Sequence, residues 1–240
     1  MISNACYIHL MTCRSAVLLM GSLLLLAGAP GSGFSLSLDE LDANASLLFI
    51  GSHPNPQPSD SEDPSLGIAP LIGVSVPLKI GGPLFVEPGL ELLGWYYRWN
   101  PDAGAAEITQ YENGVGFFTV GALVSVQAGT SVPVAAGLSL GGTVGLDFFA
   151  RLPVELQNTG LKSDESSAVS WFYGKGRFFY PESRVFLRWH VSDPVDLLFN
   201  VRAFYPLFHL WDGAGQPFWD SLMVSGGVGF AIRLKRAPAK

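Results

Sequence analysis

The chain has 240 residues, of which 48% are hydrophobic and only 14% are charged, and its mean hydropathy is +0.32. A soluble domain is about 25% charged, so this chain lacks the charge to coat a water-exposed surface. Its net charge of −6 argues against nucleic-acid binding, and its 28 glycines and 17 prolines, scattered through the apolar regions, disfavour helix interiors.

The N-terminal residues 1–33 have the features of a secretory signal peptide. Arg14 supplies a positive charge, residues 16–27 an apolar run, and Ala-Gly-Ala at 27–29 a small-residue cleavage pattern. We expect cleavage near residues 29–33. An uncleaved helical anchor is the alternative, although the run is short for a membrane span.

Both cysteines, Cys6 and Cys13, precede this apolar run. Cleavage therefore leaves a mature chain without cysteine, which excludes disulfides, thiol catalysis and cysteine metal sites. We expect residues 34–240 to form a single domain.

From residue 66 onwards, apolar residues alternate with small or charged ones. In the last segment Val224, Val228 and Phe230 share one face, while Ser225 and Arg233 share the other. A period of two predicts β-strands that separate an apolar phase from a more polar one. We predict eight strands, at residues 44–50, 66–79, 84–99, 112–127, 132–152, 177–191, 195–210 and 218–234. For the first and weakest strand, a start as early as Phe34 is the alternative.

The connections between these strands alternate in length. The long polar ones lie at residues 51–65, 100–111, 153–176 and 211–217, and the short ones at 80–83, 128–131 and 192–194. Short turns on one rim and long loops on the other are typical of bacterial outer-membrane barrels. We therefore predict an all-β, eight-stranded antiparallel up-and-down transmembrane β-barrel, with extracellular long loops and periplasmic termini.

Two other folds fit parts of the pattern. A soluble β-barrel would put Lys and Glu on its outer face, whereas the non-apolar face here is largely Gly, Ala, Ser and Thr. A helical membrane protein would use the apolar stretch 133–150, but its four glycines, its alternation and Asp147 argue against a helix.

The strand number, the turn lengths, the leader and the length of the mature chain resemble the small outer-membrane barrels. These include the OmpW family, OmpX and the OmpA transmembrane domain. The resemblance covers residues 44–234 and is architectural. Phe230 and the basic tail 235–240 depart from the aromatic C-terminus that these barrels often have. Similarity to OmpW implies a narrow barrel that conducts small, mostly hydrophobic molecules.

Nine charged residues share the face that we assign to the barrel interior. Unpaired charges in a narrow interior are costly, so we expect them to pair. They form either a salt-bridge network that plugs the barrel or a gate for small solutes. The residues are Glu87, Glu91, Asp147, Arg151, Glu182, Arg184, Arg188, Arg202 and Arg233.

Aromatic residues gather beside the long loops, where amphipathic rings prefer a membrane–water interface. We therefore expect an aromatic rim. Its members are Trp95, Tyr96, Tyr97, Trp99, Tyr180, Tyr205, Trp211 and Trp219.

No motif indicates catalysis, a metal or a cofactor. His190-Val191-Ser192 has the spacing of a lipid A deacylase pair, but our topology places it at the periplasmic rim, and Arg202 stands where an acid is needed. We therefore expect a non-enzyme without metal or cofactor.

Our leading hypothesis is a passive conduit for small hydrophobic solutes across the outer membrane. The alternative is a closed structural or adhesive barrel that acts through its surface loops. The expected partners are membrane lipid, the outer-membrane assembly machinery and a small hydrophobic solute.

Overall fold

The computed structural model describes residues 40–51, 67–101, 104–108, 116–154, 162–212 and 221–234. The predicted signal peptide, nearly all of the predicted loop 51–65 and the basic tail lie outside these residues. The strands are β1 (Glu40–Ile50), β2 (Gly67–Ser75), β3 (Leu78–Gly81), β4 (Leu84–Asn100), β5 (Ala105–Ile108), β6 (Phe117–Ala135), β7 (Leu138–Val154), β8 (Phe179–Ser192), β9 (Val195–Phe204) and β10 (Met223–Arg233). The helices are α2 (Lys162–Tyr173) and the short 3-10 helices η1 (Gly174–Gly176) and η2 (Leu207–Leu210).

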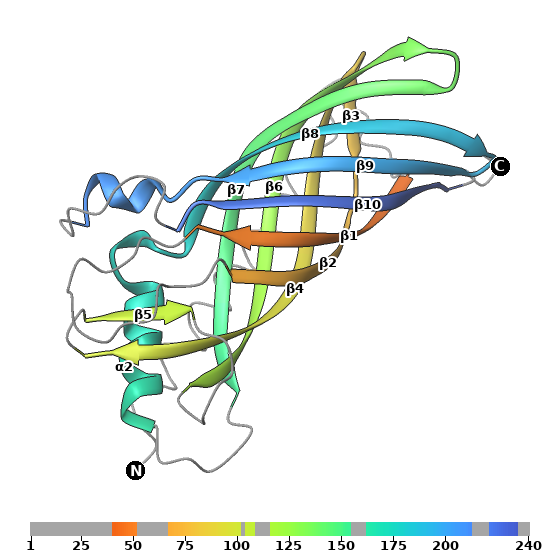
Figure 1. The fold of residues 1–240 in the computed structure, drawn as a ribbon. Helices are drawn as coiled ribbons and strands as arrows, with labels where there is room; N and C mark the ends of the chain where they lie inside the picture. Colours follow the sequence, from red (N-terminus) through yellow and green to blue (C-terminus); the bar gives the residue numbers. More distant parts are fainter. Residues whose placement is uncertain are drawn as a thin grey trace, which may run out of the picture.

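The strands form a closed antiparallel barrel. The order around it is β2-β1-β10-β9-β8-β7-β6-β4, and β2 pairs with β4 to complete the circle (Figure 1). β3 continues the line of β2 along β4, and β5 pairs with the other end of β4. The predicted eight-stranded all-β transmembrane barrel is therefore confirmed.

The two ends of the barrel differ. The tight turns at 82–83, 136–137 and 193–194 lie at one end, which we call the turn end. The helices α2 and η2 lie at the opposite end, which we call the helical end (Figure 1). Neither helix, nor η1, is long and apolar enough to cross a membrane.

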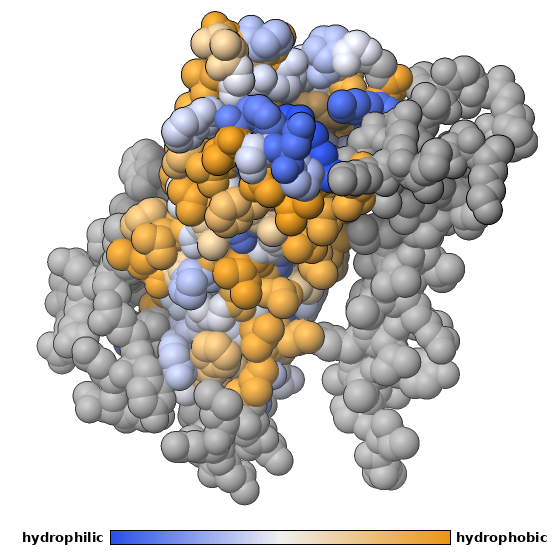
Figure 2. Space-filling model, turned by 90° about the vertical axis from the view of Figure 1, so that its right-hand side faces the viewer, coloured by the Kyte–Doolittle hydropathy of each residue, from blue (hydrophilic) through white to orange (hydrophobic). Residues whose placement is uncertain are grey.

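Side chains alternate between the barrel interior and its outer surface. Along β7, Thr143, Asp147 and Arg151 are buried, whereas Val144 and Leu146 are 66% and 56% exposed. Much of the described surface in this view is hydrophobic, with a smaller hydrophilic group near its top (Figure 2). A barrel surrounded by lipid tails requires an aliphatic outer surface and a closed ladder of backbone hydrogen bonds, and both are present here.

Several expected element boundaries were wrong. The turn predicted at 128–131 lies at 136–137, because β6 and β7 stay paired as far as Ala135 and Leu138. Gly137 adopts a φ of +71°, which favours glycine and makes the tight turn there. Strand seven ends at Phe204, shortly before Pro206, rather than at residue 210.

The connections at the helical end also contain structure that the sequence analysis missed. We expected the stretch 153–176 to be a loop, but it contains α2. The expected loop 100–111 contains β5, which extends β4 as a hairpin. The hydrophobic period of α2 is weak, since most of its exposed residues are small and polar, which explains why it was not recognised.

Leu146→Arg tests the orientation of the barrel wall. Leu146 lies near the middle of β7 and faces outward, so an arginine there should lower the free energy of unfolding in lipid by roughly 2–4 kcal/mol. Denaturant titration in vesicles measures this loss. The matched control is Ser166→Arg on the exposed face of α2, where the loss should be much smaller. Equal effects at both sites would contradict the assigned wall.

Candidate functional site

The barrel interior has two parts of different chemistry. Charged and polar side chains predominate from the turn end to the middle, with a small apolar group of Phe85, Phe186, Leu198 and Ala231 among them, and apolar side chains fill the interior towards the helical end. The charged part contains most of the predicted interior residues. Its side chains pair across the barrel axis.

Arg202 lies at the centre of the charged part. Its Nε and Nη2 donate to the two carboxylate oxygens of Glu182 at 2.6 and 2.9 Å, and its Nη1 donates to Glu91. Gln127 donates a further hydrogen bond to Glu182 at 2.5 Å. Since β9, which carries Arg202, and β4, which carries Glu91, stand opposite each other in the barrel, these contacts span its full width.

Two more arginines cross the interior on the turn-end side of Arg202. Arg184 on β8 binds Glu87 on β4 through two hydrogen bonds of 2.9 and 2.5 Å. Arg188, also on β8, donates to Glu40 on β1 at 2.7 Å and lies 3.6 Å from Asp42. Paired guanidinium and carboxylate groups thus fill successive cross-sections of the barrel.

Asp147 is fully buried near Glu182, Glu91 and Arg202. It makes no direct ion pair with any described residue, unlike the other predicted interior carboxylates. Glu40 and Asp42 were not among the predicted interior residues, although the first strand was allowed to begin as early as residue 34 and begins at Glu40. The alternation that starts at Glu40 could have identified both.

A cavity of about 820 Å³ opens at the turn end. Arg188, Phe186 and Glu40 lie at its walls, together with His190 and Arg233. Arg233, which is 47% exposed, donates to Asp196 at 2.8 Å, and His190 Nδ1 lies 2.7 Å from the same carboxylate. The described residues contain no group of three or more His, Cys, Asp or Glu side chains that could hold a metal ion.

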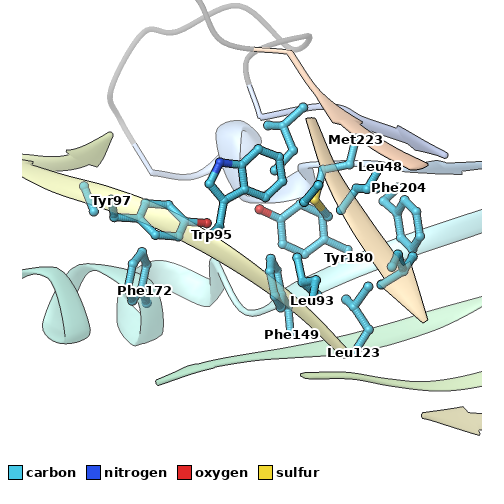
Figure 3. Packing of buried hydrophobic residues seen from close by; sticks show 14 of the residues in the cluster. Leu48, Leu93, Trp95, Tyr97, Leu123, Phe149, Phe172, Tyr180, Phe204 and Met223 are labelled. Carbon is cyan, nitrogen blue, oxygen red and sulfur yellow. The ribbon is translucent and has the colours of Figure 1, made fainter. Parts of the chain in front are cut away.

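The helical end is filled by a large group of buried apolar side chains, which we call the apolar cluster (Figure 3). It contains residues from every strand in the closed circle of the barrel and from both α2 and η2. Its members are Leu48, Ile50, Ala69, Leu71, Leu93, Trp95, Tyr97, Ala106, Phe117, Leu123, Phe149, Ala168, Phe172, Tyr180, Phe204, Phe208 and Met223.

Three of the expected rim aromatics belong to this cluster. Trp95, Tyr97 and Tyr180 point inward and are at most 7% exposed, so their place in an outward-facing rim is corrected. They lie on the inward parity of β4 and β8, and the sequence analysis gave more weight to their closeness to loops than to this parity. Trp99 packs against the same cluster.

The other rim candidates lie outside the cluster. Tyr96 contacts Phe118 on the outward face, with ring centroids 5.1 Å apart. Tyr205 forms a hydrogen bond of 2.9 Å with Ser183, and Trp211 is 58% exposed. Trp219 lies outside the described residues.

The helix α2 covers the apolar cluster. Its Phe172 packs edge-on against Tyr97 with ring centroids 4.8 Å apart. Its Tyr173 hydroxyl accepts from the backbone N–H of Arg151 at 2.9 Å and lies 3.1 Å from the backbone oxygen. Trp211 donates to the Lys175 backbone oxygen at 2.7 Å, which joins the loop of α2 to that of η2.

The barrel wall is interrupted next to the apolar cluster. The ladder between β2 and β4 runs from the Ser75–Gly89 pair to the Leu71–Leu93 pair and stops there. Among the described strands, β2 continues to Gly67 paired with β1 alone, while β4 continues paired with β6 and, from Tyr97, also with β5. We call the unpaired stretch between residues 67–70 and 94–96 the seam. The Trp95 indole packs behind it against Gly67, where a Cβ atom would stand 2.1 Å from the ring.

Solved structures of small outer-membrane barrels are similar to this chain. Neisserial surface protein A matches with a TM-score of 0.50 and 11% identity over 83% of this chain and 99% of that one. The fold is that of a small outer-membrane β-barrel. The attachment invasion locus protein Ail of Yersinia pestis, in complex with a heparin analogue, matches at 10% identity with a TM-score of 0.45 over 82% of this chain and 100% of that one. The outer-membrane protein AlkL matches at 9% identity with a TM-score of 0.38 over 89% and 98%.

No family model and no curated protein matches the sequence. The structural likeness is at a level that shows the fold alone. What the barrel does must therefore be argued from its own interior.

Arg202→Gln tests the central ion pairs. Removal of one partner leaves Glu91 and Glu182 buried without a counter-charge, so we expect the free energy of unfolding to fall by about 3–5 kcal/mol. The control is Arg98→Gln, because Arg98 pairs with Glu107 at an exposed site and such pairs contribute about 1 kcal/mol or less. Similar losses in the two variants would show that the central network does not hold the barrel together.

Proposed function

We propose that this chain resides in the bacterial outer membrane and passes small hydrophobic solutes from the outside into the membrane. In this proposal the long connections of the helical end face outward and both termini face the periplasm. Lipid and the outer-membrane assembly machinery are its partners. The observation that carries the proposal is the apolar cluster, which places a hydrophobic compartment on one side of a charged barrier.

The charged part of the interior opposes a route along the barrel axis. A hydrophobic solute on that path has to separate Arg202 from Glu91 and Glu182, and a buried charge without a partner is expensive. The axial conduit that the sequence suggested is therefore less favourable than a route that leaves the barrel before this layer.

The seam offers such a route. It lies beside the apolar cluster and is the place where β2 and β4 are not joined by backbone hydrogen bonds. Among the described residues, the Trp95 side chain packs behind this stretch against Gly67. A solute that displaces Trp95 reaches the surrounding hydrocarbon without breaking the ladder.

Entry from outside requires α2 to move. The helix is attached through the buried side chains of Ala168 and Phe172 and through Tyr173, and its loop is joined to that of η2. These contacts are few compared with the ladder hydrogen bonds of the barrel. Segments held by few contacts open at lower free energy than the strands beneath them.

The second candidate is a closed barrel that acts through its outer surface. The tight packing of the apolar cluster favours it, since Leu48, Leu71 and Phe172 are fully buried and leave no open passage. In that case the cluster serves stability alone, and the connections of the helical end bind partners.

A cross-link across the seam separates the two candidates. We replace Ile68 and Tyr96 by cysteine in the otherwise cysteine-free mature chain and join them with a short thiol cross-linker. Transfer of a neutral hydrophobic dye into liposomes that contain the protein should be lost on cross-linking and should be unchanged in the uncross-linked variant.

The control pair is Ile72→Cys with Leu92→Cys, which are already partners in the ladder. Its cross-link should leave transfer intact. If the wild-type barrel transfers no dye, the conduit proposal is wrong and the closed barrel is favoured. If both cross-links leave transfer intact, the solute does not use the seam.

A further inference from the structure

Within the part of the chain that the structure describes, two arginines at the edge of the apolar cluster have little counter-charge. Arg151 and Arg177 are 3% and 8% exposed. Arg177 pairs with Asp212, whose Oδ2 lies 3.7 Å from Arg177 Nη2 and 3.3 Å from His209 Nδ1. Arg151 has no acidic partner among the described residues.

The guanidinium of Arg151 is held by aromatic rings and a backbone oxygen. It stacks between Phe149 and Phe172, with 4.5 Å to each ring centroid, and its Nη2 donates to the backbone oxygen of Arg177. Cation–π contacts stabilise a buried cation without neutralising it. The Nε of Arg151 is buried without a hydrogen-bond partner.

Arg177, which lies nearer the helical end, is held in a similar way. It lies 4.6 Å from the centroid of Trp171, and its Nε is also buried without a partner. Burial lowers the pKa of the Arg177 guanidinium; Asp212 opposes this effect and the charge of Arg151 adds to it. In the described residues, the two buried guanidinium groups thus have one paired carboxylate, Asp212 at Arg177, and an anion beside them gains both charge and hydrogen bonds.

We infer that Arg151 and Arg177 form a binding site for the carboxylate of an amphipathic solute whose hydrocarbon chain lies in the apolar cluster. The guanidinium forks match a carboxylate, which they can bind through paired hydrogen bonds. The adjoining walls from Phe149, Phe172 and Phe208 accept only hydrocarbon. This inference rests on the proposed function, because it names the class of solute that the compartment selects.

The site also joins the solute to the cover of the compartment. Arg151 lies on β7 and Phe172 on α2, so the same guanidinium contacts the barrel wall and the helix. A carboxylate that binds Arg151 competes with the Arg177 backbone oxygen for its Nη2. Binding therefore loosens a contact between the wall and the connection that follows α2.

Equilibrium dialysis of radiolabelled decanoate and decanol tests the site. The full mature chain is held in nanodiscs, and uptake by empty nanodiscs is subtracted for each probe. Because hydrogen bonds to charged groups contribute about 1.5–3 kcal/mol, the wild type should bind decanoate at least about ten-fold more tightly than decanol. Equal affinities in the wild type overturn the inference without any variant.

The variants Arg151→Gln and Arg177→Gln should each remove most of the preference for decanoate and leave decanol binding unchanged. Arg98→Gln removes a positive charge at the same end but outside the cluster, and it should keep the preference. If all three variants behave alike, the preference reflects general charge and the site is wrong. If Arg151→Gln fails to fold, Arg177→Gln and the wild-type comparison still decide.

The outcomes distinguish this inference from the proposed function. If neutral dye crosses the seam but decanoate has no advantage, the conduit stands and the site falls. If decanoate binds through both arginines but no dye is transferred, the site stands and the conduit falls.

Discussion

The pairing of backbone hydrogen bonds around a closed circle is the constraint on which this molecule depends. Hydrocarbon offers no hydrogen-bond partner to an exposed N–H or C=O group, so the two edge strands of a sheet in a membrane have to pair and close it into a barrel. Here the circle closes where β1 pairs with β10 over eleven residue pairs and where β2 pairs with β4. The short β2–β4 ladder is the weaker of the two closures.

Closure leaves a narrow interior, and this chain fills its two halves by different means. In one half, Arg202 and its partners satisfy each other across the barrel. In the other half, aromatic side chains from the strands pack beneath α2, much as in the core of a soluble domain. The boundary between the halves lies close to the seam, so the place where the wall is least joined is also where the interior becomes apolar.

Much of the fold could be predicted from the sequence. One face of each strand meets lipid and the other meets the barrel interior, so apolar and polar residues alternate with a period of two. In the described strands, the alternation placed Val144, Leu146 and Val228 outside and Asp147 and Ser225 inside. The turn at 136–137 was misplaced because Gly129 and Ser131 look like turn residues, although they continue the ladder to β7.

The candidate site was less accessible to sequence reasoning. Parity assigns a residue to the interior but not to a height or a partner, and strand stagger decides both. The pairing of Arg184 with Glu87 therefore emerged only from the register. The special position of Arg151 depends on α2, which carries Phe172 and has too weak a pattern to be recognised. Aromatic residues near loops suit both a lipid interface and a packed barrel interior. Their position in the inward–outward alternation of the strand is the signal that separates these two roles.

Hydrogen–deuterium exchange of the protein in nanodiscs tests the closed, unequally joined barrel most directly. The account predicts that amides of the β1–β10 ladder exchange as slowly as those between β6 and β7, while amides beside the seam at residues 67–69 and 94–96 that lack ladder partners exchange faster. Rapid exchange along β1 and β10, with the other ladders protected, would show that the barrel is not closed there and would contradict the account.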